Sequence, residues 1–275
     1  MMDKLEYGWF KEQIKNLMGI DLNDYSTRQL DHRLTFIMKQ ADVKTYREYY
    51  CLLEDNPEKC RDFLKHLKIN VSSFYRDRQK WDRLTEEVLP GLVARARDRR
   101  RKSIFGPGLP ELRVWSAGCA TGAEPYSMAI VLEETKGILG FTYMHILASD
   151  VVPEVLKKAR TALFSDKDIK DIPQALKNKY LMREKDGWRV IGRARKHVKF
   201  IRHDLLKDSW STRFDLILCR NVLIYMNDHV KQRLYTQFRE NLRPGGVLFL
   251  GGSEMILQPE EYGYKKVTAS FYERV

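Results

Sequence analysis

Acidic residues follow two of the predicted strands in the second half of this 275-residue chain. The strand MHILASD ends at Asp150, and the strand VKFIRHD ends at Asp204. In parallel sheets, ligands bind at the carboxyl ends of the strands. Asp150 is therefore placed to accept hydrogen bonds from ribose hydroxyl groups, and Asp204 to meet the edge of an adenine ring. The structural alternatives are an N-cap for the helix PEVLKKAR and a solvated loop aspartate.

A glycine-containing turn follows the first predicted strand, in the segment SAGCATGAEP (residues 116–125). The simplest interpretation is a strand-to-helix turn whose backbone requires Gly118 and Gly122. The segment is not the G-x-G-x-x-G of dinucleotide-binding proteins, and it lacks the G-x-x-x-x-G-K-[ST] pattern of a P-loop. A glycine turn without a phosphate-binding pattern suits a nucleoside ligand that carries no phosphate, such as S-adenosylmethionine.

The fourth predicted strand leads into CRNVLIYM (residues 219–226). This segment lacks the N/D-P-P-Y/F motif that is common in enzymes that methylate amino groups of nucleic acid bases, which speaks against that reaction. The four cysteines form no C-x-x-C pair, and the six histidines show no H-x-x-x-H spacing. We therefore expect reduced thiols and no metal site.

Polar and aromatic residues are packed together in NVSSFYR (residues 70–76), between two predicted helical regions. Such a segment is a candidate binding motif. The alternative is the C-terminal turn of a helix that contributes a few aromatic side chains to the core.

The first 76 residues are predicted to be helical. Ser26 and Gln29 have the spacing of a capping box for the second helix, and the fourth helix is expected over Pro57–Lys68. A further helical stretch from Trp81 to Arg101 is expected to be interrupted at Pro90-Gly91, because proline removes a helix hydrogen bond.

From Glu111 onward, strands alternate with helices, which predicts a mostly parallel sheet covered on both faces. The segment PGG (residues 244–246) is expected to close the last helix before the fifth strand, and the chain is expected to end in an antiparallel pair. We predict an α/β, Rossmann-like fold in three parts. These are a helical domain at residues 1–76, a sheet domain with its linker helix at residues 77–275, and a small β-subdomain with a hairpin inserted at residues 164–202.

The formal net charge of +12 favours acidic partners, which include nucleic acid, an anionic membrane surface and an acidic protein. The charged N-terminus does not resemble a signal peptide, and no stretch approaches the roughly 18 apolar residues of a membrane span. We expect a cytoplasmic protein with no direct membrane insertion. Three basic residues of the second helix, Arg28, Arg33 and Lys39, are expected to be largely solvated.

Taken together, five ordered segments resemble the chemotaxis receptor methyltransferases of the CheR family. They are NVSSFYR, RVWSAGCATGAEPYS, ASDVVPEVLKKAR, FDLILCRNVLIY and the ending PGG-strand-GGSE. The resemblance covers essentially the whole chain. It implies a Rossmann-like methyltransferase that transfers methyl groups from S-adenosylmethionine to glutamate side chains of chemoreceptors. It also implies that the insertion is the family's β-subdomain.

Arg76 and Tyr225 are the expected catalytic residues, because a guanidinium matches the carboxylate of the cofactor and Tyr225 lies just past the fourth predicted strand. The resemblance implies most of the cofactor site. The expected cofactor-binding residues are Asn70, Ser72, Arg76, Gly118, Glu124, Asp150, Asp204, Leu205, Arg220 and Asn221.

This chain departs from the family pattern at several positions. Ser72 and Tyr75 replace a threonine and a phenylalanine and keep the hydroxyl and the ring, respectively. Of two usual acids before Pro-Tyr-Ser, only Glu124 remains. Asp204 stands where asparagine is frequent. The hairpin sequence EKDGWRV lacks the glycine-containing insertion of members that bind a receptor tail, so we expect no strong binding of such a tail.

A glutamate carboxylate is already ionised at neutral pH, since its ordinary pKa is about 4.3. Methyl transfer to it needs desolvation and alignment rather than a general base. The expected partners are acidic, glutamate-bearing receptor helices, and the enzyme is expected to act as a monomer without nucleic acid. Two alternatives stay open: a basic RNA or DNA methyltransferase, and a non-catalytic adaptor that binds the cofactor.

Overall fold

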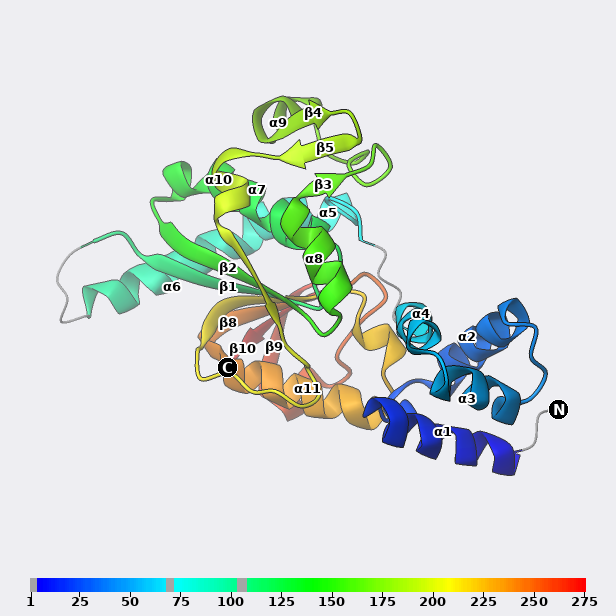
Figure 1. The fold of residues 1–275 in the computed structure, drawn as a ribbon. Coiled ribbons are helices and arrows are strands. Elements are labelled where there is room, and N and C mark those ends of the chain that lie inside the picture. Colours follow the sequence, from blue (N-terminus) through cyan, green and yellow to red (C-terminus); the bar gives the residue numbers. More distant parts are fainter. Residues whose placement is uncertain (1–3, 68–71, 103–107) are drawn as a thin grey trace. The chain divides into compact units, whose positions relative to one another are not determined.

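The computed structural model describes residues 4–67, 72–102 and 108–275 (Figure 1). The chain divides into two compact units. The first comprises Met1–Asn70 and Leu223–Arg233, and the second comprises Val71–Val222 and Leu234–Val275. This division differs from the boundary expected after residue 76, because the segment that follows Asn70 belongs to the second unit. The first unit also includes a short segment from late in the sequence.

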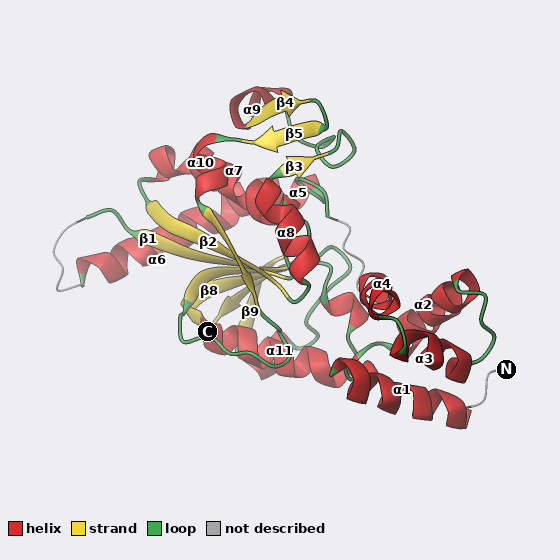
Figure 2. Cartoon of the chain, viewed as in Figure 1, coloured by secondary structure: helices red, strands yellow, loops and turns green. Residues whose placement is uncertain are grey.

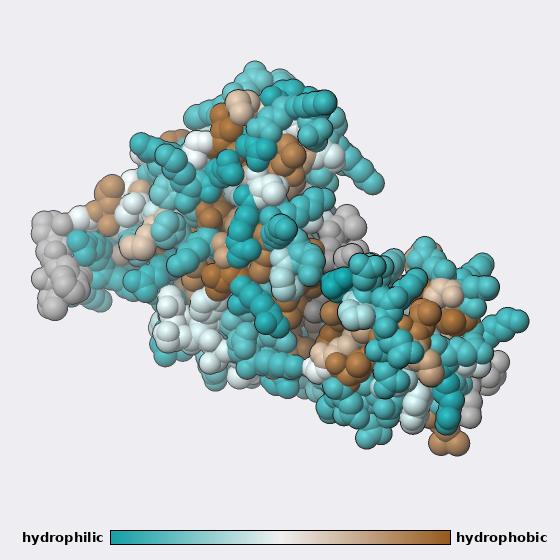
Figure 3. Space-filling model, viewed as in Figure 1, coloured by the Kyte–Doolittle hydropathy of each residue, from teal (hydrophilic) through white to brown (hydrophobic). Residues whose placement is uncertain are grey.

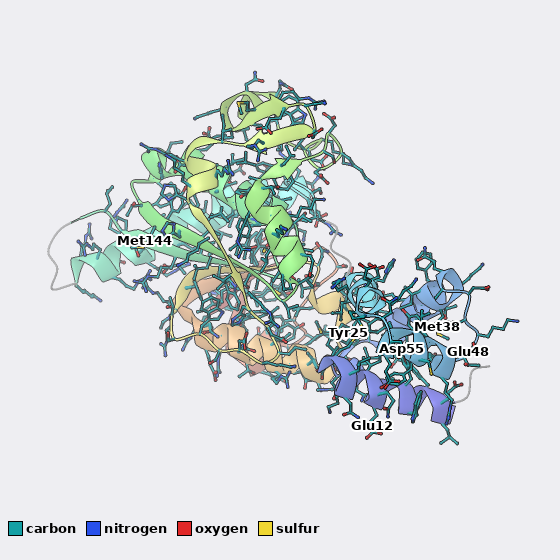
Figure 4. The ribbon with its side chains drawn as sticks, in the orientation of Figure 1. Glu12, Tyr25, Met38, Glu48, Asp55 and Met144 are labelled. Carbon is teal, nitrogen blue, oxygen red and sulfur yellow. The ribbon has the colours of Figure 1, made fainter. Side chains whose placement is uncertain are left out.

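The first unit is helical and contains α1 (Lys4–Met18), α2 (Thr27–Gln40), α3 (Tyr46–Glu54) and α4 (Pro57–Leu67). Short 3-10 turns lie at Leu22–Asp24 and Leu223–Tyr225. The rings of Phe10, Tyr46 and Phe63 pack together in its core. Met38 and Tyr25, both labelled in Figure 4, are buried in the same core.

The capping box expected at Ser26 and Gln29 is wrong. Ser26 is the N-cap of α2, but its side chain makes no capping hydrogen bond. Its backbone N–H donates to the carbonyl of Tyr225 at 2.9 Å, so this donor is not left for Gln29. A capping box forms instead at the start of α3, between Thr45 and Glu48.

The second unit contains a seven-stranded sheet in the order β6-β2-β1-β7-β8-β10-β9. Neighbours among the first five strands are parallel, and β10 is antiparallel to both β8 and β9. This arrangement confirms the Rossmann-like prediction. The strands are β1 (Glu111–Ala117), β2 (Thr142–Asp150), β6 (Val198–Arg202), β7 (Phe214–Cys219), β8 (Leu242–Leu250), β9 (Tyr264–Thr268) and β10 (Phe271–Arg274).

Helices accompany this sheet, as Figure 2 shows. They are α5 (Arg78–Arg83), α6 (Leu89–Arg101), α7 (Ala123–Leu139), α8 (Pro153–Thr161), α10 (Gly192–Lys196) and the part of α11 (Asp228–Asn241) that follows Arg233, with a 3-10 turn at Pro259–Tyr262. The interruption expected at Pro90-Gly91 is wrong. A π-helical segment, Leu84–Val88, precedes α6, and Pro90 lies in the first turn of α6, where its missing N–H costs little. The PGG segment also differs from expectation, because β8 already begins at Leu242.

The insertion forms a small antiparallel sheet in the order β3-β5-β4, near the top of Figure 1. It contains β3 (Leu163–Phe164), α9 (Gln174–Tyr180), β4 (Leu181–Glu184) and β5 (Gly187–Val190). The predicted hairpin is confirmed, with Glu184 paired to Gly187. Gly187 has a φ of +148°, and a Cβ there would lie 2.4 Å from the carbonyl oxygen of Phe164.

Hydrophilic side chains cover much of the face drawn in Figure 3, in keeping with the high content of charged residues. Within the described ranges, the helices are all too short or too polar to cross a lipid bilayer.

Candidate functional site

The turn after β1 is held against the end of β2. The backbone N–H groups of Gly118 and Cys119 both donate to the carbonyl of Ser149 at 2.8 Å. Gly118 has a φ of +76°, and a Cβ there would lie 2.6 Å from a methyl group of Val222. Only glycine fits this position without displacing Val222. Gly118 therefore allows the turn to pack closely against Val222 at the carboxyl end of the sheet.

Asp150 connects this turn to the start of α8. One carboxylate oxygen accepts a hydrogen bond from Ala120 N at 3.0 Å, and the other accepts one from Val152 N, also at 3.0 Å. Asp150 is buried, and the N-cap of α8 is Val152 rather than Asp150. Asp150 thus fixes the turn after β1 to the start of α8 and places a carboxylate at the end of β2.

A buried charge cluster lies between β1, β7 and the start of α5. Ser116 Oγ donates to Glu124 Oε1 at 2.7 Å, and Arg220 Nη1 lies 3.9 Å from Glu124 Oε2. Arg220 Nη2 also donates to the carboxylate of Asp77 at 3.0 Å. Burial raises the pKa of Glu124, and the positive charge of Arg220 opposes this shift. Burial likewise lowers the pKa of Arg220 from its ordinary value.

Arg76 is tied to this cluster through its backbone. Its carbonyl accepts hydrogen bonds from Arg220 Nη2 at 2.7 Å and from Trp81 Nε1 at 3.0 Å. The positive charge of its half-buried side chain also lowers the pKa of Glu124. The neighbouring rings of Phe74 and Tyr75 are buried, so the alternative of core aromatic residues holds for these two side chains. Ser72 is partly buried, and Asn70 lies outside the described residues.

Asn221 follows Arg220 and has a φ of +59°, which is uncommon for a residue other than glycine. Its backbone N–H donates to Glu254 Oε2 at 2.8 Å. Glu254 was not among the residues expected from the sequence, although it ends the GGSE motif that contributed to the family resemblance.

Asp204 is partly buried and lies in a hydrogen-bonded turn. Its carboxylate accepts a hydrogen bond from Leu206 N at 2.9 Å, and Leu205 lies inside the turn. The preceding residue, His203, is buried, and its backbone N–H donates to the carbonyl of Asp150 at 3.1 Å. This bond brings the Asp204 turn next to Asp150. His203 is a second residue of this region that sequence reasoning missed.

Tyr225 belongs to the first unit. There, the guanidinium of Arg33 lies over its ring at 4.2 Å from the centroid. Its expected role at the methyl-transfer site remains a prediction.

The second unit thus brings Arg76, Gly118, Glu124, Asp150 and Arg220 to one end of its sheet. Arg220 Nε is buried and has no hydrogen-bond partner within the ranges that the structure covers. The residues present fit S-adenosylmethionine, because a carboxylate suited to ribose hydroxyls, guanidinium groups suited to a carboxylate and a glycine turn lie at the same end of the sheet. Among the residues described, no group of histidine, cysteine or acidic side chains could hold a metal ion.

Two family models match this chain. Residues 70–271 match the CheR methyltransferase, SAM binding domain, and residues 5–67 match the CheR methyltransferase, all-alpha domain. The chain is 37% identical over 268 residues to the chemotaxis protein methyltransferase of Listeria monocytogenes, covering 97% of this chain and 96% of that protein. It is 30% identical over 249 residues to the chemotaxis protein methyltransferase of Borreliella burgdorferi, covering 88% and 85% of the two chains.

Proposed function

Because this chain belongs to the CheR methyltransferase family, we propose that it transfers the methyl group of S-adenosylmethionine to glutamate side chains of chemoreceptors, forming methyl esters. The observation that carries this proposal is that Asp150, which ends β2, and the Glu124–Arg220 pair both lie at the carboxyl end of the sheet, within the segment that matches the SAM binding domain.

S-adenosylmethionine, when bound, supplies a methyl group activated by a positively charged sulfur. In our proposal, Asp150 binds the ribose hydroxyl groups, while Asp204 and Leu205 line the adenine. Arg76 pairs with the carboxylate of the cofactor, because a guanidinium matches that group in geometry and charge. The remaining residues expected to line this site are Asn70, Ser72, Gly118, Glu124, Arg220 and Asn221.

The acceptor carboxylate is ionised at neutral pH, so the chain needs no residue to remove a proton from it. The enzyme's task is to remove water from the acceptor and to hold it in line with the methyl group. We assign the shaping of this acceptor site to Tyr225. The proposal thus accounts for an enzyme whose sequence shows no nucleophile paired with a general base.

Receptor recognition is assigned to the exposed basic residues of α2. Arg28 and Lys39 are exposed. The expectation that Arg33 is largely solvated is wrong, because its guanidinium is half-buried, donates to the carbonyl of Leu67 and lies over Tyr225. Burial lowers the pKa of Arg33. Arg28 and Lys39 are therefore the better candidates for attracting acidic receptor helices.

The test is incubation of the protein with radiolabelled S-adenosylmethionine and either a receptor cytoplasmic fragment or RNA. We expect label on the receptor that is released by mild alkali, because carboxylic methyl esters hydrolyse readily in base. Alkali-stable label, or label on RNA alone, would contradict the proposal. Cofactor binding without transfer to either substrate would support the adaptor alternative.

A further inference from the structure

Glu254 joins the loops that follow two neighbouring strands. It lies in the loop after β8 and is 6% exposed. Its Oε2 atom accepts one hydrogen bond from Asn221 N at 2.8 Å and another from Gly251 N at 2.7 Å. Asn221 follows β7, so one carboxylate oxygen connects the ends of β7 and β8.

The packing around this oxygen is tight. A Cβ on Gly251 would lie 2.6 Å from Glu254 Oε2, 2.8 Å from Asn221 N and 2.9 Å from Asn221 Nδ2. Asn221 is also held at a φ of +59°, in the left-handed region that asparagine enters more readily than most residues other than glycine. The hydrogen bond from Asn221 N to Glu254 Oε2 fixes this conformation.

We propose that Glu254 is a positioning residue for the cofactor site. It holds the Asn221 turn, and with it the adjacent Arg220, in the conformation that meets S-adenosylmethionine. This inference rests on the proposed function for the identity of the cofactor, but it concerns the geometry of the turn rather than the methyl acceptor.

The test compares Glu254→Ala with Glu254→Gln by calorimetric titration with S-adenosylhomocysteine. Both backbone bonds end on one oxygen, so the amide oxygen of glutamine can accept both of them. We expect affinity about tenfold weaker in Glu254→Ala and within about twofold of the parent in Glu254→Gln. Glu254→Gln keeps an oxygen that can accept both hydrogen bonds and removes the negative charge, so it shows which of the two supports cofactor binding.

A second substitution tests the same turn while keeping the carboxylate. Gly251→Ala forces a Cβ against Glu254 Oε2 and Asn221 N, and we expect it to weaken S-adenosylhomocysteine binding by a similar factor. Parental affinity in folded Glu254→Ala and Gly251→Ala proteins would overturn the proposal.

Asp215 provides the matched control. Its carboxylate is 1% exposed and accepts a backbone N–H from Arg113 at 2.8 Å, but it lies at the amino-terminal edge of the same sheet. We expect Asp215→Ala to lower stability without weakening cofactor binding. If Asp215→Ala and Glu254→Ala lose the same affinity, Glu254 affects binding only through the stability of the fold, and the inference is overturned. Since the titration needs no receptor, a parent protein that binds cofactor but methylates nothing would count against the proposed function alone.

Discussion

Arg220 and Glu124 form a buried ion pair in which Arg220 Nη1 lies 3.9 Å from Glu124 Oε2, with side chains that are 2% and 11% exposed. The guanidinium also lies over the ring of Phe249, 4.7 Å from its centroid. Removing one partner of such a pair leaves a buried charge without compensation, which is more costly than removing both.

We therefore expect Arg220→Met to lower the free energy of unfolding by about 3–5 kcal/mol. Burial already raises the pKa of Glu124, and losing the arginine raises it further. A carboxyl group with a raised folded-state pKa favours the folded state when protonated, so stability falls as pH rises through that pKa. Urea denaturation should show a larger deficit at pH 8 than at pH 5. The double variant with Glu124→Gln should recover part of the loss, and an equal deficit at both pH values would contradict the argument.

Asp150→Ala should weaken cofactor binding. Each lost hydrogen bond to a charged group is worth about 1.5–3 kcal/mol. The same change removes the acceptor for Ala120 N and Val152 N, so stability must be measured alongside affinity. Calorimetric titration of a protein shown to be folded provides the check. Unchanged affinity would remove Asp150 from the site.

Arg76→Ala should nearly abolish methyl transfer and leave the fold intact. The hydrogen bonds from Arg220 and Trp81 end on the backbone carbonyl of Arg76, which the substitution keeps. Arg78→Ala is the matched control, because Arg78 is an exposed arginine of the same segment. Circular dichroism tests the fold and label transfer tests the activity. Normal turnover by a folded Arg76→Ala protein would show that the assigned role is wrong.

Charge reversal at Arg28 and Lys39 should raise the apparent KM for the receptor, most strongly at low salt. Exposed charges are screened over about 8 Å at physiological ionic strength, so the difference from the parent should shrink as salt is added. Cofactor affinity should not change. Lys196→Glu, an exposed reversal on α10 of the second unit, is the control. Equal methylation by the variant and the parent at low salt would exclude this docking role.

His203→Phe should reduce the loss of stability in acid. The imidazole is buried and stacks on Trp210 with ring centroids 4.6 Å apart, and burial lowers the pKa of His203 below its ordinary value. The unfolded chain therefore takes up a proton at higher pH than the folded protein. The contribution of neutral His203 to the free energy of unfolding is fully present above about pH 6.5, the ordinary histidine pKa. It is lost as pH falls through the lower pKa of the folded state. Thermal unfolding between pH 5 and 7 tests this, with exposed His32→Phe as control. The same acid slope in His203→Phe and the parent would contradict it.

The sequence by itself determined the features that depend on neighbours along the chain. Strand and helix periodicity predicted a sheet built from strands that alternate with helices. Glycine in the turn after β1 predicted a backbone conformation that is strained in residues with a side chain. Acids at the ends of parallel strands, such as Asp150, could be located because strand ends of a parallel sheet meet at one edge.

Only the tertiary structure decided which distant groups share a hydrogen bond or a charge. Glu254 reaches Asn221 across 33 positions, and Arg220 reaches Asp77 across 143. The sequence does not distinguish Arg33 from Arg28 and Lys39, the exposed basic residues of the same helix. Packing against Tyr225 nevertheless takes the guanidinium of Arg33 partly out of solvent. Local pattern carries no information on these pairings, because they depend on strand register, loop closure and the space left after the core is packed.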